Sequence, residues 1–100
     1  MTTLIDDVLG ALKSIDYEDY VDTEGIAEDL GASIEEDGIH LGDMRWGHIE
    51  GAVLCRGLNG QFEYVMVSQY VYSGDSDGPN DAYAHEVTPV HIDRIEWQEV

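Results

Sequence analysis

Residues 49–70 have the sequence IEGAVLCRGLNGQFEYVMVSQY, and this stretch predicts a β-hairpin. Its turn is expected at Asn59 and Gly60, the preferred pair for a two-residue type I′ turn, in which both residues adopt positive φ. Both faces of the hairpin are apolar near its middle. This predicts central strands covered on two sides, by helices on one face and by something else on the other.

The turn also sets the register of the two strands. Pairing Leu58 with Gln61 places Arg56 opposite Glu63, an opposite-charge pair of the kind that stabilises neighbouring strands. The same register brings apolar residues together in facing pairs. These pairs are Leu54 with Val65, Ala52 with Val67, Cys55 with Tyr64, Val53 with Met66, and Ile49 with Tyr70.

Two helices are expected before the hairpin. Residues 4–15 carry apolar side chains at three- and four-residue steps, which is typical of an amphipathic helix, and Thr3 is suited to cap it. A second helix is expected to begin at a cap formed by Asp22 or Thr23. It should end at Gly31, because glycine readily adopts the left-handed conformation that closes a helix.

Strands are also expected after the hairpin. Residues 74–81 are rich in turn formers and predict a surface loop, after which 84–88 and 90–100 have strand character. Pro89 marks an edge or a bulge, because it has no amide hydrogen to donate to a strand ladder. The alternation of apolar residues changes phase after Ile92, which predicts a bulge near Asp93 and Arg94.

The expected fold is therefore α+β, with two N-terminal helices followed by a mostly antiparallel sheet of about four strands. A chain of 100 residues is expected to form a single domain spanning 1–100. Within it, we expect an acidic helical part over residues 1–37 and a β part over residues 38–100.

Charge is distributed unevenly along the chain. The sequence has 22 Asp and Glu against 4 Lys and Arg, a net charge of −18. Residues 1–43 hold thirteen of the carboxylates and one lysine, residues 44–72 carry no net charge, and residues 73–100 carry −6. Such a one-signed field destabilises a fold through self-repulsion and accelerates association with a cationic partner. It also repels nucleic acid and anionic lipid, so neither is an expected direct partner.

The sequence lacks the signals that are typical of several classes of protein. The N-terminus has no secretory signal pattern and no apolar run approaches the roughly 18 residues of a membrane span, so a cytoplasmic protein is expected. Cys55 is alone in an apolar run, which predicts a reduced, buried thiol. There is no nucleophile elbow and no glycine-rich phosphate loop, so we expect neither an enzyme nor a cofactor.

Metal binding is not expected either. Four carboxylates resemble part of a calcium-binding loop: Asp75, Asp77, Asp81 and Glu86. Pro79 occupies a ligand position of that pattern and Asn80 replaces its turn glycine, so a solvated loop is expected instead. The four histidines lack the spacing of a zinc ligand pair.

Residues 26–33 resemble the first helix and turn of the helix-turn-helix DNA-binding family. The matching positions are Ala27, Leu30, Gly31 and Ser33. The resemblance implies a recognition helix beginning near Ile34, where DNA binding requires basic side chains but this chain has carboxylates. A degenerate helix-turn-helix regulator is thus one alternative, and a halophile-adapted cytoplasmic domain is another.

The acidic half also permits imitation of DNA. Glu24 and Glu28 would lie on adjacent helical turns, with Cβ atoms about 5–6 Å apart, a spacing comparable with that of phosphates along a strand. Like charges at this spacing destabilise a helix, so they bring no advantage to the fold itself. Tyrosines interspersed among the acids of residues 16–22 are favoured at protein interfaces.

In size, charge and acidic N-terminal half, the chain resembles the small acidic α/β proteins by which bacteriophages block CRISPR effectors or restriction enzymes. The resemblance implies an inhibitor in the host cytoplasm that occupies the basic groove of a nucleic-acid-binding protein. The sequence also leaves open a homodimer formed through the second face of the hairpin. The candidate partner-binding residues are Asp16, Tyr17, Glu18, Asp19, Tyr20, Asp22, Glu24, Glu28, Asp29, Glu35, Glu36, Asp37 and Trp46.

Overall fold

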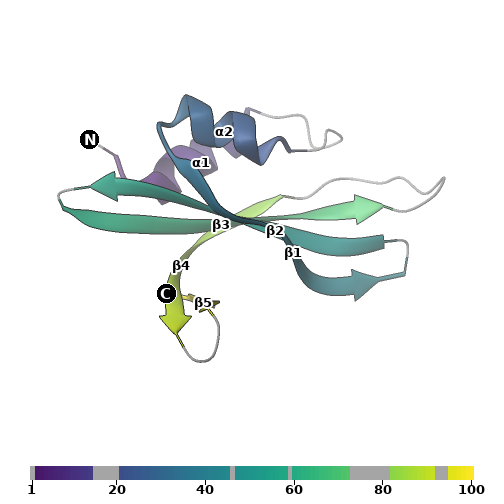
Figure 1. The fold of residues 1–100 in the computed structure, drawn as a ribbon. Helices are drawn as coiled ribbons and strands as arrows, with labels where there is room; N and C mark the ends of the chain where they lie inside the picture. Colours follow the sequence, from purple (N-terminus) through teal and green to yellow (C-terminus); the bar gives the residue numbers. More distant parts are fainter. Residues whose placement is uncertain (1, 15–20, 46, 59, 73–81, 92–94) are drawn as a thin grey trace.

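The structure is a computed structural model that describes residues 2–14, 21–45, 47–58, 60–72, 82–91 and 95–100 (Figure 1). Within these ranges two helices precede five strands, and strands that follow one another in sequence are antiparallel neighbours in the order β1-β2-β3-β4-β5. The expected α+β fold is confirmed, with one strand more than expected. The elements are α1 (Leu4–Lys13), α2 (Thr23–Asp29), β1 (Ser33–Met44), β2 (Gly47–Leu58), β3 (Gln61–Tyr72), β4 (Tyr83–His91) and β5 (Ile95–Glu99).

The hairpin of β2 and β3 has the register predicted from its turn. Every expected pair occurs, from Leu58 with Gln61 to Ile49 with Tyr70. Gly60 has a φ of +78°, a conformation that most other residues adopt only with strain. Local turn chemistry therefore determined the pairing of the two central strands.

The helix caps were also predicted correctly. The side chain of Thr3 accepts a hydrogen bond from the amide of Asp6, and Asp22 accepts one from the amide of Gly25 at 3.2 Å. Gly31 follows α2 with a φ of +68°. Helix α1 ends at Lys13, two residues before the expected end at residue 15.

The sheet buries apolar residues on both faces, as the sequence predicted. Both helices lie over one face of the sheet, whereas the far end of β4 and strand β5 lie on the other side (Figure 1). The core under the helices contains Leu4, Val8, Val21, Ile26, Ala27, Leu54, Val65 and Val67. The second face has a smaller buried cluster of Val53, Met66 and Val87, against which Ile39, Tyr64 and Trp97 pack.

The expected boundary between a helical and a β part at residues 37 and 38 was wrong, because β1 begins at Ser33. Ser33 pairs with Cys55 of β2, and the side chain of Ile34 packs against the core under the helices. Ladder hydrogen bonds and this apolar contact favour a strand here. The helix-turn-helix alternative is overturned, since its recognition helix would have to occupy the first residues of β1.

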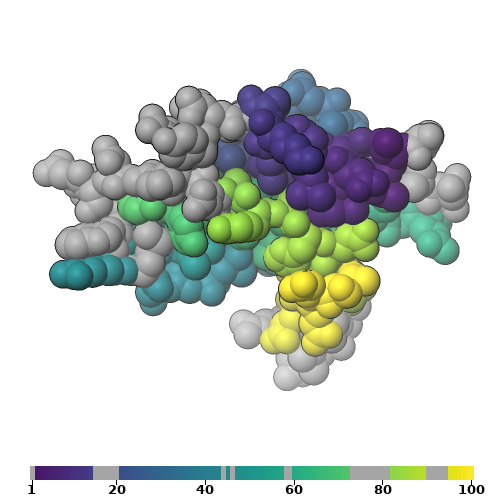
Figure 2. Space-filling model, turned by 180° about the vertical axis from the view of Figure 1, so that it is seen from behind, coloured from purple at the N-terminus to yellow at the C-terminus, as the bar shows by residue number. Residues whose placement is uncertain are grey.

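The C-terminal segment differs from the single bulged strand expected over residues 90–100. His91 pairs with Ile95, so the chain reverses and forms the hairpin of β4 and β5, while residues 92–94 lie outside the described part. The phase change in the apolar pattern marks this reversal and accounts for the fifth strand. Figure 2 shows β5 projecting from the body of the molecule.

Strand β4 leaves the main sheet part-way along its length. It pairs with β3 only from Val65 to Ser68, and beyond that point its partner is β5. Pro89 lies opposite Trp97 in this departing section, which agrees with the edge position expected for a proline. The expected loop at 74–81 lies outside the described residues.

Candidate functional site

Four of the predicted partner-binding carboxylates lie on or next to α2. Asp22 caps this helix, and Glu24, Glu28 and Asp29 belong to it. All four side chains are exposed, while the opposite side of α2 buries Ile26 in the core. These four carboxylates, Asp22, Glu24, Glu28 and Asp29, are called the acidic helix face below.

The predicted second row of carboxylates does not form a row. A register shift between Ile34 and Glu36 breaks the alternation of β1. Glu35 and Glu36 both reach the second face of the sheet, where they line one cavity. Asp37 instead lies on the helix side, in a small hollow beside Thr23 of α2. All three carboxylates are exposed, but the sheet separates them into two groups.

Six predicted contact residues remain. They lie outside the described part of the chain and are Asp16, Tyr17, Glu18, Asp19, Tyr20 and Trp46. Val21, the first described residue after position 20, is hydrogen-bonded to the sheet. The buried side chain of Gln69 accepts a hydrogen bond from the Val21 amide at 2.9 Å and donates one to the Val21 carbonyl at 3.0 Å. This double contact positions the start of α2.

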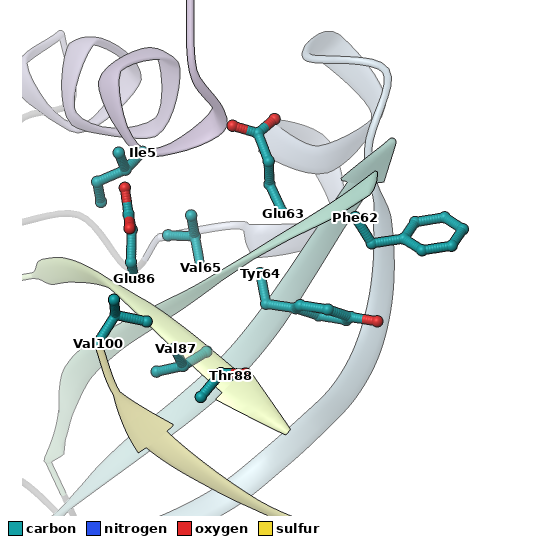
Figure 3. Close-up of a pocket in the computed structure, with 9 residues that line it drawn as sticks. All are labelled: Ile5, Phe62, Glu63, Tyr64, Val65, Glu86, Val87, Thr88 and Val100. Atoms are coloured by element: carbon teal, nitrogen blue, oxygen red, sulfur yellow. The ribbon is translucent and has the colours of Figure 1, made fainter. Parts of the chain in front are cut away.

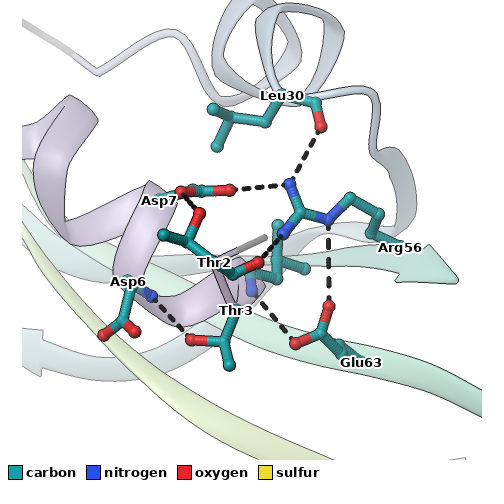
Figure 4. A network of polar contacts seen from close by, with 8 residues as sticks. Thr2, Thr3, Asp6, Asp7, Leu30, Arg56 and Glu63 are labelled. Atoms are coloured by element: carbon teal, nitrogen blue, oxygen red, sulfur yellow. Dashed lines mark hydrogen bonds and ion pairs between the residues drawn. The ribbon is translucent and has the colours of Figure 1, made fainter. Parts of the chain in front are cut away.

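Arg56 lies between the beginning of α1 and the residue that follows α2 (Figure 4). Its guanidinium donates to Asp7 at 2.8 Å, to the Leu30 carbonyl at 3.2 Å and to the Thr2 carbonyl at 3.0 Å. It also lies 3.8 Å from Glu63, as the hairpin register predicted. The only arginine on β2 is therefore engaged inside the fold and does not neutralise the acidic helix face.

Two carboxylates around Arg56 assist α1 as well. Glu63 accepts a hydrogen bond from the amide of Leu4, one of the N-terminal amides that lack a partner within the helix. Asp7 has its pKa lowered below the ordinary value of 3.8 by hydrogen bonds from Thr2 and Arg56. Their negative charges lie at the positive end of the α1 dipole, where carboxylates are stabilising.

An apolar groove lies on the second face of the sheet, and the sequence did not predict it. The groove has a volume of about 630 Å³, within the range of roughly 300–1,000 Å³ common for ligand sites. We call it the back groove. Its apolar lining consists of Ile39, Leu41, Met66, Ile95 and Trp97, and its polar lining consists of Glu36, His40 and Glu96.

Contacts between distant strands build the back groove. The indole of Trp97 donates a hydrogen bond to Glu36, which joins β5 to β1, and its ring centroid lies 5.2 Å from that of Tyr64 on β3. A smaller cavity of about 210 Å³ continues along Trp97 toward Glu35 and Pro89. The apolar second face of the hairpin was the sequence signal from which an apolar site on this side could have been predicted.

Gly51 forms part of the floor of the second face. A Cβ atom at this position would lie 2.8 Å from Leu41 and 3.2 Å from the sulfur of Met66. Glycine therefore allows both side chains to pack directly over the β2 backbone. Leu41 and Ile95 remain 42% and 50% exposed, so the groove presents apolar surface to solvent.

Burial and negative charge combine beside this groove. Burial raises the pKa of the Tyr64 hydroxyl, with smaller contributions from Cys55 and Glu35. Burial also raises the pKa of the Cys55 thiol, and Glu35 adds to the effect. Both groups are therefore neutral near pH 7, and Cys55 is the buried thiol that the sequence predicted.

A further cavity, of about 270 Å³, lies where β4 departs from β3, under α1 (Figure 3). Glu63 and Glu86 flank it, and Phe62 at its margin is 69% exposed. The oxygen Oε2 of Glu63 is buried there without a hydrogen bond, although the Arg56 side chain lies nearby. Glu63 therefore belongs both to the lining of this cavity and to the Arg56 cluster.

Two histidines meet at the far end of the β1-β2 hairpin. The rings of His40 and His48 stack with centroids 5.7 Å apart, and each lies near a carboxylate, at 3.3 Å for Asp43 and 3.9 Å for Glu50. In the part of the chain that the structure describes, no group of three or more His, Cys, Asp or Glu could hold a metal ion. Nor does any helix there have the length and apolar character to cross a membrane.

Comparison with known proteins found no relative of this chain. The chain matches no protein-family model, and neither a curated protein nor a solved structure matches it.

Proposed function

We propose that this chain is a binding protein, not an enzyme, that docks on a basic, nucleic-acid-binding groove of a partner protein. The carboxylates of the acidic helix face take the place of DNA phosphates in this proposal. CRISPR effectors and restriction enzymes are partners of this kind. The interaction is with the protein partner and requires no direct contact with nucleic acid.

The observation that carries the proposal is that, within the described part of the chain, no Lys or Arg forms an ion pair with the acidic helix face. The sequence contains no Lys or Arg between Lys13 and Arg45. The nearby guanidinium of Arg56 is engaged with Asp7 and with backbone carbonyls. The exposed carboxylates of α2 thus keep their negative charge for an external partner.

Only part of the acidic helix face helps α2 to form, since Asp22 caps the helix but Glu28 and Asp29 do not stabilise it. Glu24 favours the N-terminus of the helix, but Glu28 and Asp29 lie at its C-terminal end, where negative charge opposes the helix dipole. Glu24 and Glu28 also repel each other across one turn. Exposed groups that weaken their own helix are more readily explained by binding than by folding.

The direct test is co-purification of the tagged chain with proteins of its cells in low salt. A basic, nucleic-acid-binding protein should be retained at about 0.05 M NaCl and released at about 0.5 M, because charge pairs at a surface are screened by salt. Excess duplex DNA should also release it. Retention of no basic protein, or retention that DNA leaves unchanged, would contradict the proposal.

Matched variants locate the interaction on the molecule. The triple variant Glu24→Gln, Glu28→Gln, Asp29→Asn should lose most of the retained partner. A control triple variant removes the same charge from exposed carboxylates elsewhere, by Asp43→Asn, Glu86→Gln and Glu99→Gln, and should retain it. Equal losses from both variants would show that net charge acts without a defined face.

A further inference from the structure

The back groove combines an apolar floor with an acidic rim. Met66 and Ile39 form the floor, and Glu36 and Glu96 line the rim together with His40. Glu35 lines the smaller cavity that continues from the groove along Trp97. An occupant must therefore supply apolar atoms to the floor and positive charge to the rim.

Charge argues against the other occupants that the chain itself could supply. A second copy would bring a net charge of −18 and the same rim carboxylates toward this groove. The chain's own segment at 74–81 contains three aspartates and no basic residue. Both would add like charge to the rim carboxylates, which is destabilising.

We propose that the back groove binds a segment of the partner protein in which apolar side chains alternate with lysine or arginine. The inference rests on the proposed function, since it takes the partner to be cationic. It adds a second contact on the opposite face of the sheet from the acidic helix face. The apolar side chains occupy the space between Ile39, Met66 and Trp97, and the basic ones pair with Glu36 at the rim and with Glu35 in the adjoining cavity.

The Trp97 indole is the natural reporter of binding. Its hydrogen bond to Glu36 places it between the apolar floor and the acidic rim, so an occupant changes its environment from both sides. The probe is a seven-residue peptide of alternating lysine and leucine, titrated into the ¹⁵N-labelled full chain. One control peptide has serine in place of leucine, and the other has glutamate in place of lysine.

The lysine-leucine peptide should shift the Trp97 indole resonance and bind at least about fivefold more tightly than the lysine-serine peptide. The glutamate-leucine peptide should not bind. Equal binding of the two lysine peptides, an unchanged Trp97 resonance, or no binding at all would each overturn the inference.

Leu41 and Ile95 form the exposed apolar edge of the back groove, which we call its lip. Substitutions at the lip distinguish binding in the groove from nonspecific apolar association. Leu41→Ser and Ile95→Ser should each weaken binding of the lysine-leucine peptide about fivefold, because each removes apolar contact area. Phe62→Ser and Tyr83→Ser remove apolar side chains that are 69% and 56% exposed outside this groove, and both should leave the affinity within about twofold. Equal losses in all four variants would overturn the inference.

The inference and the proposed function can fail separately. If the lip variants lose the peptide while the acidic helix variant still retains the cellular partner, the groove stands and the proposed DNA imitation fails. If the acidic helix variant loses the partner while the lip variants bind the peptide normally, the groove proposal fails alone.

Discussion

Arg56 joins two helix ends to the centre of the sheet. Its side chain is 16% exposed and its contacts reach Asp7 in α1 and the Leu30 carbonyl after α2. The hairpin register predicted its cross-strand partner Glu63, since a two-residue turn determines which residues face each other. It did not predict Asp7, which is 49 residues away in sequence and approaches only when α1 packs on the sheet.

Replacing Arg56 by methionine should lower the free energy of unfolding by about 2–3 kcal/mol. The apolar side chain fills similar space but leaves Asp7 and the Leu30 carbonyl without their hydrogen-bond donor and Glu63 without its ion-pair partner. Urea denaturation measures the change. The surface variant Lys13→Gln removes the same charge and should cost less than about 1 kcal/mol. Similar losses in the two variants would show that Arg56 contributes only net charge.

The hydrogen bonds to Asp7 should make part of the stability depend on pH. Because its pKa lies below the ordinary value of 3.8, ionised Asp7 stabilises the fold above that pH. The contribution is lost as pH falls through the folded-state pKa. The stability difference between the wild type and Asp7→Asn should therefore be largest near pH 6 and shrink below about pH 4. Denaturation at several pH values measures it, and a difference that grows toward acid would contradict the assignment.

At the scale of elements, the fold depends on polar contacts that join segments far apart in sequence. The side chain of Gln69 in β3 holds both backbone groups of Val21, 48 residues away. This contact holds Val21, two residues before α2, at a buried position of the sheet. Sequence patterns could place both residues in apolar surroundings but could not pair them.

Gln69→Leu should therefore destabilise the protein by about 2–4 kcal/mol, since it leaves a buried amide and a buried carbonyl unpaired. Amide exchange at Val21 should accelerate by more than the global loss of stability alone explains. Gln61→Leu alters an exposed glutamine of the same strand and should change stability by less than about 0.5 kcal/mol. A change at Gln69 as small as this control would show that the double contact is not formed in solution.

At the scale of the whole molecule, a net charge of −18 opposes folding while the two apolar faces of the sheet favour it. Salt weakens the repulsion but leaves the apolar packing in place, because the Debye length falls to about 3 Å at 1 M. The wild type should accordingly melt at a higher temperature in 1 M NaCl than in dilute buffer.

The triple variant Glu24→Gln, Glu28→Gln, Asp29→Asn should be more stable than the wild type by up to about 1 kcal/mol in dilute buffer. The gain should largely vanish in 1 M NaCl, where screening acts on both proteins. Thermal melts of the two proteins at both salt concentrations measure this. A wild type that folds only in molar salt would instead support the halophile alternative.

Local chemistry in the chain was enough to predict the central hairpin, its register, the helix caps and the turn at Gly31, because each depends on residues close in sequence or on a two-residue turn. The beginning of β1 and the reversal before β5 were missed, since pairing with a distant strand decides them. The same holds for the separation of Glu35 and Glu36 from Asp37, which a bulge in β1 causes. The back groove exists only once β1, β3 and β5 meet, as contacts between remote segments can form only in the folded chain.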